Sequence, residues 1–280
     1  MLRSICAALA AVLAAAGLAA AAEGEFKHKE YKHEHWHFDG VFGGFEQETL
    51  QRGYQVYREI CSGCHSMELL SFRNLSQKGG PFFLESCPEG APDNIDCSNP
   101  NDNPIVKAIA AEYEITDGVD DYGDPVSRPR TPADRFPSPF ANEQQARAAN
   151  GGAYPPDMSL LVKARHHGPD YIYSLLTGYE EEPPEDFEVQ PGLYYNPYFE
   201  TGALAMAQPL YDGMIDYADM DESQETVEQY SKDVVEFLTW AAEPKLQVRK
   251  QMGFMVVAYL FLFTVILYLS YKKIWANVEH

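Results

Sequence analysis

Apolar positions follow a helical period in two segments of the chain. The first segment runs from Glu46 to Cys64, and its apolar or small residues are Leu50, Gly53, Tyr54, Tyr57, Cys61 and Cys64. The second runs from Glu225 to Ala242 and repeats the pattern at Val227, Tyr230, Val234, Phe237, Leu238 and Ala241. Steps of three and four residues place such side chains on one face of a helix. We therefore expect two amphipathic helices, with the cysteines on the buried face of the first.

A third apolar segment, residues 252–271, carries no polar stripe. Its twenty residues include no charged side chain, and this length is sufficient to cross a bilayer. Glu243-Pro244 separates it from the preceding helix. The sequence predicts a transmembrane helix at 252–271, with a basic juxtamembrane segment at 245–251 before it and a cytoplasmic tail at 272–280 after it.

The first 22 residues have the pattern of a cleaved secretory signal. Arg3 precedes a run of Ala, Leu and Val, and Ala20 and Ala22 fit the small-residue cleavage rule. A retained N-terminal anchor is the alternative. Export would place the following domain on the periplasmic side of a bacterial inner membrane, with the C-terminus in the cytoplasm. Basic residues lie on both sides of the span, so they do not decide this orientation.

Charge and composition narrow the class of partner. The chain has 42 acidic and 21 basic residues and a formal net charge of -21. This balance argues against nucleic-acid binding and favours a cationic partner, or serves only solubility. Pro, Gly, Asn and Asp interrupt residues 81–152, so we expect loops and short helices there.

Histidines are concentrated in residues 23–45, at His28, His33, His35 and His37. We interpret this stretch as a solvated N-terminal extension, with loose metal binding as the alternative, because no second ligand cluster completes a closed site.

Four cysteines remain once the leader, which holds Cys6, is removed. Cys87 and Cys97 flank a stretch rich in Pro, Asn and Asp, a composition typical of a surface loop. An oxidising compartment would allow them to pair. We predict a disulfide between them, and two separate buried thiols are the alternative.

The other two cysteines belong to the motif Cys61-Ser62-Gly63-Cys64-His65. Thiols three positions apart suit thioether bonds to the two vinyl groups of a haem, and the adjacent imidazole can bind the iron from one side. A redox dithiol usually needs a thioredoxin-like sheet, and zinc needs a second ligand pair. The motif occurs once, so we predict one covalently attached haem c with His65 as an iron ligand.

The sixth iron ligand must come from elsewhere, and methionine or histidine is usual in an electron carrier. Met206 lies between Ala205 and Ala207, which permit close approach to a flat ring, whereas Met158 follows two prolines and an aspartate. The pattern favours Met206 and leaves Met158 as a rival. Candidate donors to the haem propionates are Arg147, Arg165 and Tyr171.

Seven sequence blocks carry a family resemblance over nearly all of the mature chain. They are Gly53 to Tyr57 with the Cys-Ser-Gly-Cys-His motif, Ala148 to Ser159, Asp170 to Tyr179, Tyr195 to Phe199, Met206 to Pro209, Trp240 to Pro244 and Arg249 to Gly253. In this order they resemble the cytochrome c1 family, the haem subunits of the quinol:cytochrome c oxidoreductase, or cytochrome bc1 complex. The stretch between Cys87 and Cys97 and the histidine-rich segment are not part of the pattern.

The resemblance implies a fold and a ligand set. The fold is mainly α, with a class I cytochrome c-like haem domain at 46–244 that carries long loop insertions, followed by one C-terminal transmembrane helix. The implied axial ligand opposite His65 is Met206, not Met158. The other implied haem contacts are with a propionate, at Arg165 and Tyr171, and with the ring, at Pro155 and Pro156.

The resemblance also implies a role and partners. Members take an electron from the Rieske iron-sulfur protein and pass it to a soluble or tethered cytochrome c, within a dimeric complex that contains cytochrome b. The complex is the enzyme, and this chain alone makes no bonds. The acidic residues that could dock the acceptor, or form only solvated loops, are Glu180, Glu181, Glu182, Glu185, Asp186, Glu188, Asp219, Asp221 and Glu222. An independent membrane-anchored carrier, and a haem sensor or haem enzyme with an open sixth position, are the alternative functions.

Overall fold

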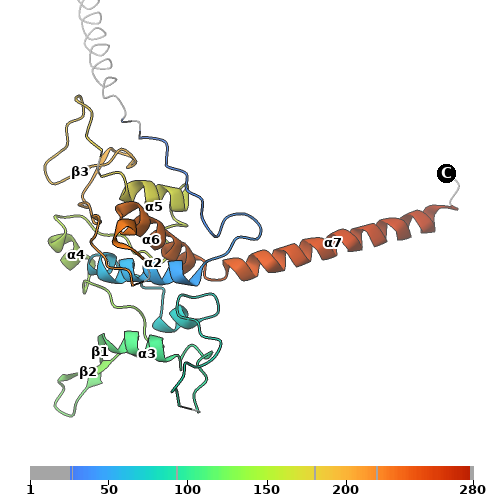
Figure 1. Ribbon diagram of the computed structural model, residues 1–280, viewed down its shortest axis with the longest axis horizontal. Coiled ribbons are helices and arrows are strands. Elements are labelled where there is room, and N and C mark those ends of the chain that lie inside the picture. The colour runs from blue at the N-terminus through green and yellow to red at the C-terminus, as the bar shows by residue number, and fades with distance from the viewer. Residues whose placement is uncertain (1–25, 27, 93, 180, 219, 278–280) are drawn as a thin grey trace, which may run out of the picture.

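The computed structural model describes residues 26, 28–92, 94–179, 181–218 and 220–277. The predicted leader, residues 1–22, lies outside the described residues. Within them the structure is mainly helical, as predicted, and one long helix, α7, extends away from the rest (Figure 1).

Two helices, α2 (Gln47–Glu59) and α6 (Val227–Ala242), pack against each other at the centre of the domain (Figure 1). Both helices predicted from the apolar period are present, but α2 ends at Glu59, before the cysteines, and most of α6 is buried instead of one face. A Cβ atom at Gly53 would lie 2.1 Å from the carbonyl oxygen of Asp233 and 2.6 Å from Cβ of Phe237. The glycine therefore permits the close approach of the two helices, which Arg52 reinforces through an ion pair with Asp233.

Shorter elements surround this pair. Helix α5 (Gly168–Leu176) packs on α6. Two further helices, α3 (Pro104–Ala111) and α4 (Glu143–Ala149), belong to the region in which we expected loops and short helices. The 3₁₀ helices are Cys61–Gly63, Phe72–Ser76 and Glu222–Gln224.

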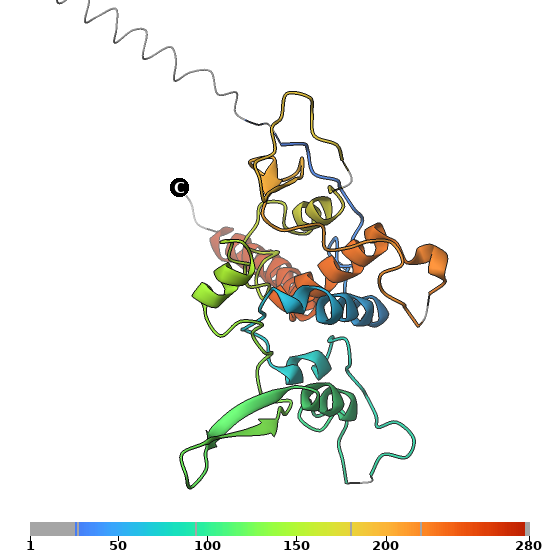
Figure 2. The same cartoon turned by 90° about the vertical axis from the view of Figure 1, so that its left-hand side faces the viewer.

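Strands are few and lie at the periphery. Strands β1 (Glu114–Val119) and β2 (Pro125–Pro129) form an antiparallel hairpin, and β3 (Tyr194–Tyr195) pairs with β4 (Ala203–Leu204) in the same sense. The β1–β2 hairpin projects from the edge of the domain beside α3 (Figure 2). We did not predict it, because its side chains are almost all exposed and it shows no apolar alternation.

The predicted disulfide is present between Cys87 and Cys97, whose Cα atoms are 5.0 Å apart. It closes the Pro- and Asp-rich surface loop, and the Cys97 side is buried.

The predicted apolar span lies within α7 (Leu246–Trp275), a helix of 30 residues whose apolar 18-residue window has a mean hydropathy of 2.4. It is the one helix in the described part of the chain that is long and apolar enough to cross a membrane. The basic segment 245–251, predicted as a separate unit, is largely the first turns of this helix. Apart from Leu246, the side chains of α7 are not buried in the domain, which fits a membrane anchor.

The histidine-rich segment is not a solvated extension, contrary to our expectation. Residues 28–45 run along α5 and α6, with Trp36 and Phe38 4% and 7% exposed. The indole Nε1 of Trp36 donates to Asp170 (2.8 Å), and Nδ1 of His37 lies 2.8 Å from Oε1 of Glu236. Alternating aromatic residues bury one side of this segment, which we call the N-terminal strap. The described residues include no group of three or more His, Cys, Asp or Glu that could hold a metal ion.

Candidate functional site

The two motif cysteines lie just beyond α2 and not on its buried face, which corrects our expectation. The helix ends at Glu59, and Cys61–Gly63 continue as a 3₁₀ turn. The amides of Cys64 and His65 both donate to the carbonyl oxygen of Cys61, at 3.1 and 2.9 Å. The turn thus holds two unbonded thiols and the imidazole in one compact unit.

The environment of these thiols differs from that of a reactive dithiol. Burial raises the pKa of the Cys61 thiol to about 12. Redox-active cysteines have a lowered pKa that favours the thiolate. The motif is also surrounded by α-helices and 3₁₀ turns and not by a thioredoxin-like sheet. The alternative of a redox-active dithiol therefore fits poorly.

The ring of His65 is held in one orientation. Its Nδ1 lies 2.8 Å from the carbonyl oxygen of Pro156, and because a carbonyl only accepts, Nδ1 carries the proton. Burial lowers the pKa of His65, which favours the neutral imidazole. Within the described part of the chain, Nε2 makes no hydrogen bond or ion pair. The free lone pair on Nε2 is the form in which histidine binds a metal.

Asp157 joins the segment that holds His65 to the loop that holds Pro156. Its Oδ2 accepts from the hydroxyl of Ser66 (2.9 Å) and the amide of Glu68 (2.8 Å), and its Oδ1 from the amide of Ser159 (2.9 Å). Burial raises the pKa of Asp157, but these hydrogen bonds outweigh it and the net shift is downward. The charged carboxylate therefore acts as a clamp that fixes Pro156 against His65.

The backbone of Met158, the rival methionine, is bonded to the segment that carries His65. Its amide donates to the carbonyl of Ser66 at 2.8 Å, and the residue is 8% exposed within the core cluster. Met158 is therefore occupied in core packing.

Met206 follows β4 in a partly exposed loop. Its carbonyl accepts a 2.9 Å hydrogen bond from the hydroxyl of Tyr179, which is otherwise largely buried, and burial raises the pKa of that hydroxyl. The bond fixes the backbone of the loop, while the thioether has no recorded polar contact in the described residues.

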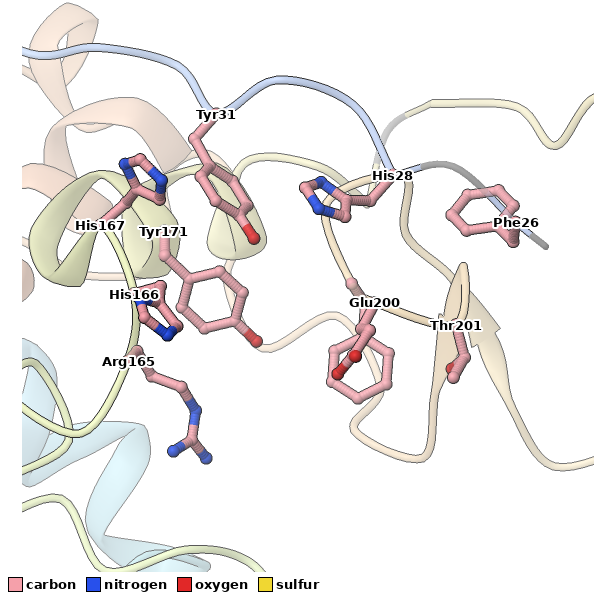
Figure 3. Close-up of a pocket in the computed structure, with 10 residues that line it drawn as sticks. Phe26, His28, Tyr31, Arg165, His166, His167, Tyr171, Glu200 and Thr201 are labelled. Atoms are coloured by element: carbon pink, nitrogen blue, oxygen red, sulfur yellow. The ribbon is translucent and has the colours of Figure 1, made fainter.

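Arg165 and Tyr171 line an open cavity of about 1050 Å³. Both extend into it from the region of α5, and Glu200 and Thr201 come from the opposite side (Figure 3). Burial raises the pKa of Tyr171 and outweighs the opposite effect of the nearby Arg165 charge. Tyr31 of the N-terminal strap packs edge-on against Tyr171, with 5.4 Å between ring centroids. A cationic and a phenolic donor thus point into one polar space, as a carboxylate ligand requires.

The third propionate candidate, Arg147, does not line this cavity. It bonds to Glu143 (2.9 Å) and to the carbonyl of Gly152 (3.0 Å). A second hollow, of about 580 Å³, is lined by Cys64, Pro155 and Tyr154 among others.

The predicted residues therefore fall into two groups. One group contains Cys61, Cys64 and His65 with the two prolines. The other contains Arg165 and Tyr171, and Met206 is linked to it because Tyr179, which bonds to the Met206 carbonyl, lies near Tyr171. No hydrogen bond among the described residues joins the first group directly to the second.

A comparison with protein families decides what kind of chain this is. The model of the "Cytochrome C1 family" matches residues 36–278. The chain belongs to the cytochrome c1 family. Its match begins at Trp36, so the buried part of the N-terminal strap lies within the family region.

Individual relatives agree. Cytochrome c1 of Rhodospirillum rubrum is 42% identical over 284 residues, covering 96% of this chain and 95% of the relative. The mitochondrial cytochrome c1 heme protein of Saccharomyces cerevisiae is 41% identical over 87% of this chain and 72% of its own length. The cytochrome b/c1 of Bradyrhizobium diazoefficiens is 44% identical over 86% of this chain, which spans only 35% of that relative. A mitochondrial cytochrome c1 heme protein of Arabidopsis thaliana is 45% identical over 78% of this chain, and the match covers 64% of that relative.

Membership of the cytochrome c1 family implies a haem cofactor, and the residues present fit one. Two unbonded thiols three positions apart are the groups that covalent haem attachment uses, and the available Nε2 of His65 suits the iron. The arginine and tyrosine of the cavity suit a propionate.

Sequence reasoning missed the residues that orient this site. Asp157, Ser66 and Ser159 form the clamp, and Tyr179 holds the Met206 loop. The sequence did hold a signal for part of the clamp, because an aspartate side chain commonly accepts a hydrogen bond from the amide two residues later, here that of Ser159. No local signal pointed to Tyr179, because its partner is 27 residues away.

Proposed function

We propose that this chain is the electron-transferring haem subunit of a cytochrome bc1 complex, which passes electrons from the Rieske iron-sulfur protein to a soluble or tethered cytochrome c. The observation that carries the proposal is the His65 ring, which has a fixed tautomer and an available Nε2 beside two unbonded thiols. A bound haem supplies one-electron exchange, and the chain supplies its attachment, ligands and surroundings.

Each residue of the site has a stated role in this proposal. One haem c is attached through Cys61 and Cys64, in a domain of the class I cytochrome c type. His65 and Met206 bind the iron from opposite faces. Arg165 and Tyr171 bind a haem propionate. Pro155 and Pro156 pack against the edge of the ring. Met158 is assigned to core packing, which its burial in the core cluster supports.

The membrane arrangement follows from the anchor and the leader. Residues 46–244 form the haem domain on the periplasmic side, residues 252–271 of α7 cross the inner membrane once, and residues 272–280 are the cytoplasmic tail. Cytochrome b is the membrane partner, and the complex is a dimer. Reductase activity belongs to the complex as a whole.

The acidic docking surface is proposed on the loop before β3. Glu182, Glu185, Asp186 and Glu188 are exposed there, whereas Glu181 already pairs with Lys29. Clustered negative charge accelerates encounter with a cationic protein and makes the rate salt-dependent. Glu180 and Asp219 lie outside the described residues.

Purification in mild detergent tests the assignment to a complex. We expect the c-type spectrum of this chain to co-migrate with a b-type haem, and reduced quinol to reduce its haem rapidly. A monohaem protein that migrates alone and is not reduced by quinol would instead support an independent membrane-anchored carrier.

Two methionine variants test the sixth ligand. A thioether favours the reduced iron, so Met206→Leu should lower the midpoint potential and let the reduced protein bind carbon monoxide. Met158→Leu is the matched control, because it changes a buried methionine of the core cluster and should leave the midpoint unchanged. The ligand assignment fails if Met206→Leu leaves the midpoint unchanged.

A further inference from the structure

A short loop of the N-terminal strap lies beside the first turns of α7 (Figure 1). The amide of Gly44 donates to the carbonyl of His37 at 2.9 Å and closes the base of the loop, residues 38–43. A Cβ at Gly43 would lie 1.8 Å from the carbonyl oxygen of Asp39, so only glycine fits this turn. The loop is therefore a built turn with a defined tip, and we call it the 38–43 loop.

Three backbone carbonyls of this loop are bonded by one side chain of α7. The ammonium of Lys250 donates to the carbonyls of Phe38, Gly40 (2.7 Å) and Gly43 (3.4 Å). An ammonium has three donors, and here each reaches a backbone oxygen of the loop. Peptide carbonyls that are bonded in this way can enter a less polar environment at a lower cost in free energy.

The tip carries two apolar side chains that the protein does not cover. Val41 and Phe42 are 62% and 87% exposed. The ring of Phe42 contacts that of Phe254 in α7, with 5.9 Å between centroids. Phe254 belongs to the apolar span, so the exposed tip continues the apolar surface of the anchor.

We propose that the 38–43 loop is a second membrane contact, which inserts Val41 and Phe42 into the interfacial layer of the bilayer beside α7. The inference rests on the membrane placement of α7 proposed above.

Depth and charge both favour lipid as the occupant. Phe254 follows Lys250 by four residues, so it lies about 6 Å further along the helix axis. An interfacial element buries its apolar side chains about 5–10 Å into the boundary of headgroups and acyl chains. Lys245, at the N-cap of α7, suits an anionic headgroup. Arg249 instead pairs with Glu243, and Lys250 binds the loop itself. Apolar groups at the water-facing start of a span are thus placed where a bilayer begins.

Spin labels at three positions test the proposal. Phe42→Cys reports on the loop, Val257→Cys on α7 and Tyr122→Cys on the β1–β2 hairpin, where Tyr122 is 92% exposed. The introduced cysteine is the one free thiol of the mature chain when the haem occupies Cys61 and Cys64 and the disulfide is intact. The haem-loaded protein with its co-purifying subunits is reconstituted in vesicles of phosphatidylcholine and phosphatidylglycerol, and collision with oxygen is compared with collision with a water-soluble nickel chelate.

We expect the label at Phe42 to show an oxygen-to-nickel ratio several-fold above that at Tyr122 and close to that at Val257. A ratio equal to that at Tyr122 places the loop in water and overturns the inference. A label reached by neither reagent means that another protein chain covers the tip, which also overturns it. If Val257 itself is accessible to nickel, the proposed span fails, a result distinct from failure of the loop alone.

A further variant tests the role of Lys250. Lys250→Met removes all three donors to the loop and should lower the oxygen-to-nickel ratio of the label at Phe42 by at least half. Arg249→Met is the matched control, since Arg249 pairs with Glu243 and not with the loop. Equal effects of the two variants would contradict the assigned role of Lys250.

Discussion

Replacing Asp157 with alanine should change both the stability and the redox potential of the protein. The carboxylate accepts hydrogen bonds from Ser66, Glu68 and Ser159, and these hold the Pro156 carbonyl 2.8 Å from Nδ1 of His65. Asp157→Ala removes all three bonds without touching a proposed haem ligand. The variant therefore separates the positioning of His65 from its presence.

The expected loss of stability follows from these bonds. Hydrogen bonds to a charged group contribute about 1.5–3 kcal/mol each, so three fully buried bonds would give roughly 4.5–9 kcal/mol. Asp157 is only partly buried, and the amide of Glu68 can bind water once it is freed. We therefore expect a loss of about 2–4 kcal/mol in the free energy of unfolding. Asp157→Asn keeps one acceptor oxygen, so its free energy of unfolding should lie between those of Asp157→Ala and the unaltered protein.

The midpoint potential should rise in Asp157→Ala. A hydrogen bond from Nδ1 increases the basicity of the ring, and a more basic ligand stabilises the oxidised metal. If loosening this bond changes the relative stability of the two oxidation states by about 1 kcal/mol, the midpoint rises by about 40 mV, since about 59 mV corresponds to a tenfold change for one electron.

The assays are denaturant unfolding followed by the haem absorbance and a potentiometric titration. Asp134→Ala is the control, because that carboxylate clamps Arg128 and Thr131 instead of the His65 loop. It should reduce stability and leave the midpoint unchanged. The reasoning is refuted if Asp157→Ala unfolds like the unaltered protein, or if both variants move the midpoint equally.

Three further predictions concern the fold. Gly53→Ala should lower the free energy of unfolding by about 1–3 kcal/mol, because the added methyl group overpacks against α6 and outweighs the better helix propensity of alanine. Glu59→Ala, at an exposed position of the same helix, should change the free energy of unfolding by no more than about 0.5 kcal/mol in the same denaturant assay. Hydrogen bonds from Arg128 hold the pKa of Asp134 well below its usual range, so its stabilisation is present above the unfolded pKa of about 3.9 and lost as the pH falls through the folded value. The difference in Tm between the unaltered protein and Asp134→Asn should therefore shrink on acidification, and a growing difference would contradict this sign. Removing the disulfide with the double variant Cys87→Ala, Cys97→Ala should lower the free energy of unfolding by at most about 3 kcal/mol, the loop-closure value for a separation of 10 residues. The midpoint potential should not change, and a shifted midpoint would show that the loop influences the haem.

The parts of the fold that could be predicted are those whose signal is local. The positions of α2 and α6 follow from spacing along the chain, because their apolar residues recur at helical steps. The burial of α6 on most of its sides does not follow from spacing, since α5 also packs on it. The unbroken apolar run of α7 was equally clear. The β1–β2 hairpin gave no such signal, since a ribbon exposed on both faces needs no alternation of apolar and polar residues.

The N-terminal strap shows a different kind of failure. Its signal was present, because the buried Trp36 and Phe38 alternate with the more exposed His35 and His37. Four histidines in a short tract suggested solvation instead. The groups that bind the strap are Asp170 and Glu236, more than a hundred residues away, so the chain around it could not reveal that it is covered.

The same limit of distance applies to the candidate site. Cys61, Cys64 and His65 could be proposed as haem ligands from the sequence, because covalent haem attachment requires these residue types in one short motif. The orientation of His65 depends on Pro156, 91 residues later, and spacing cannot show which carbonyl meets a given nitrogen. The loop that presents Pro156 to His65 also carries Met158, whose amide bonds to the carbonyl of Ser66 and which lies in the core cluster. In the proposed site Met158 is therefore already used in packing, and the sixth ligand has to come from another part of the chain. Only the folded chain reveals this relation.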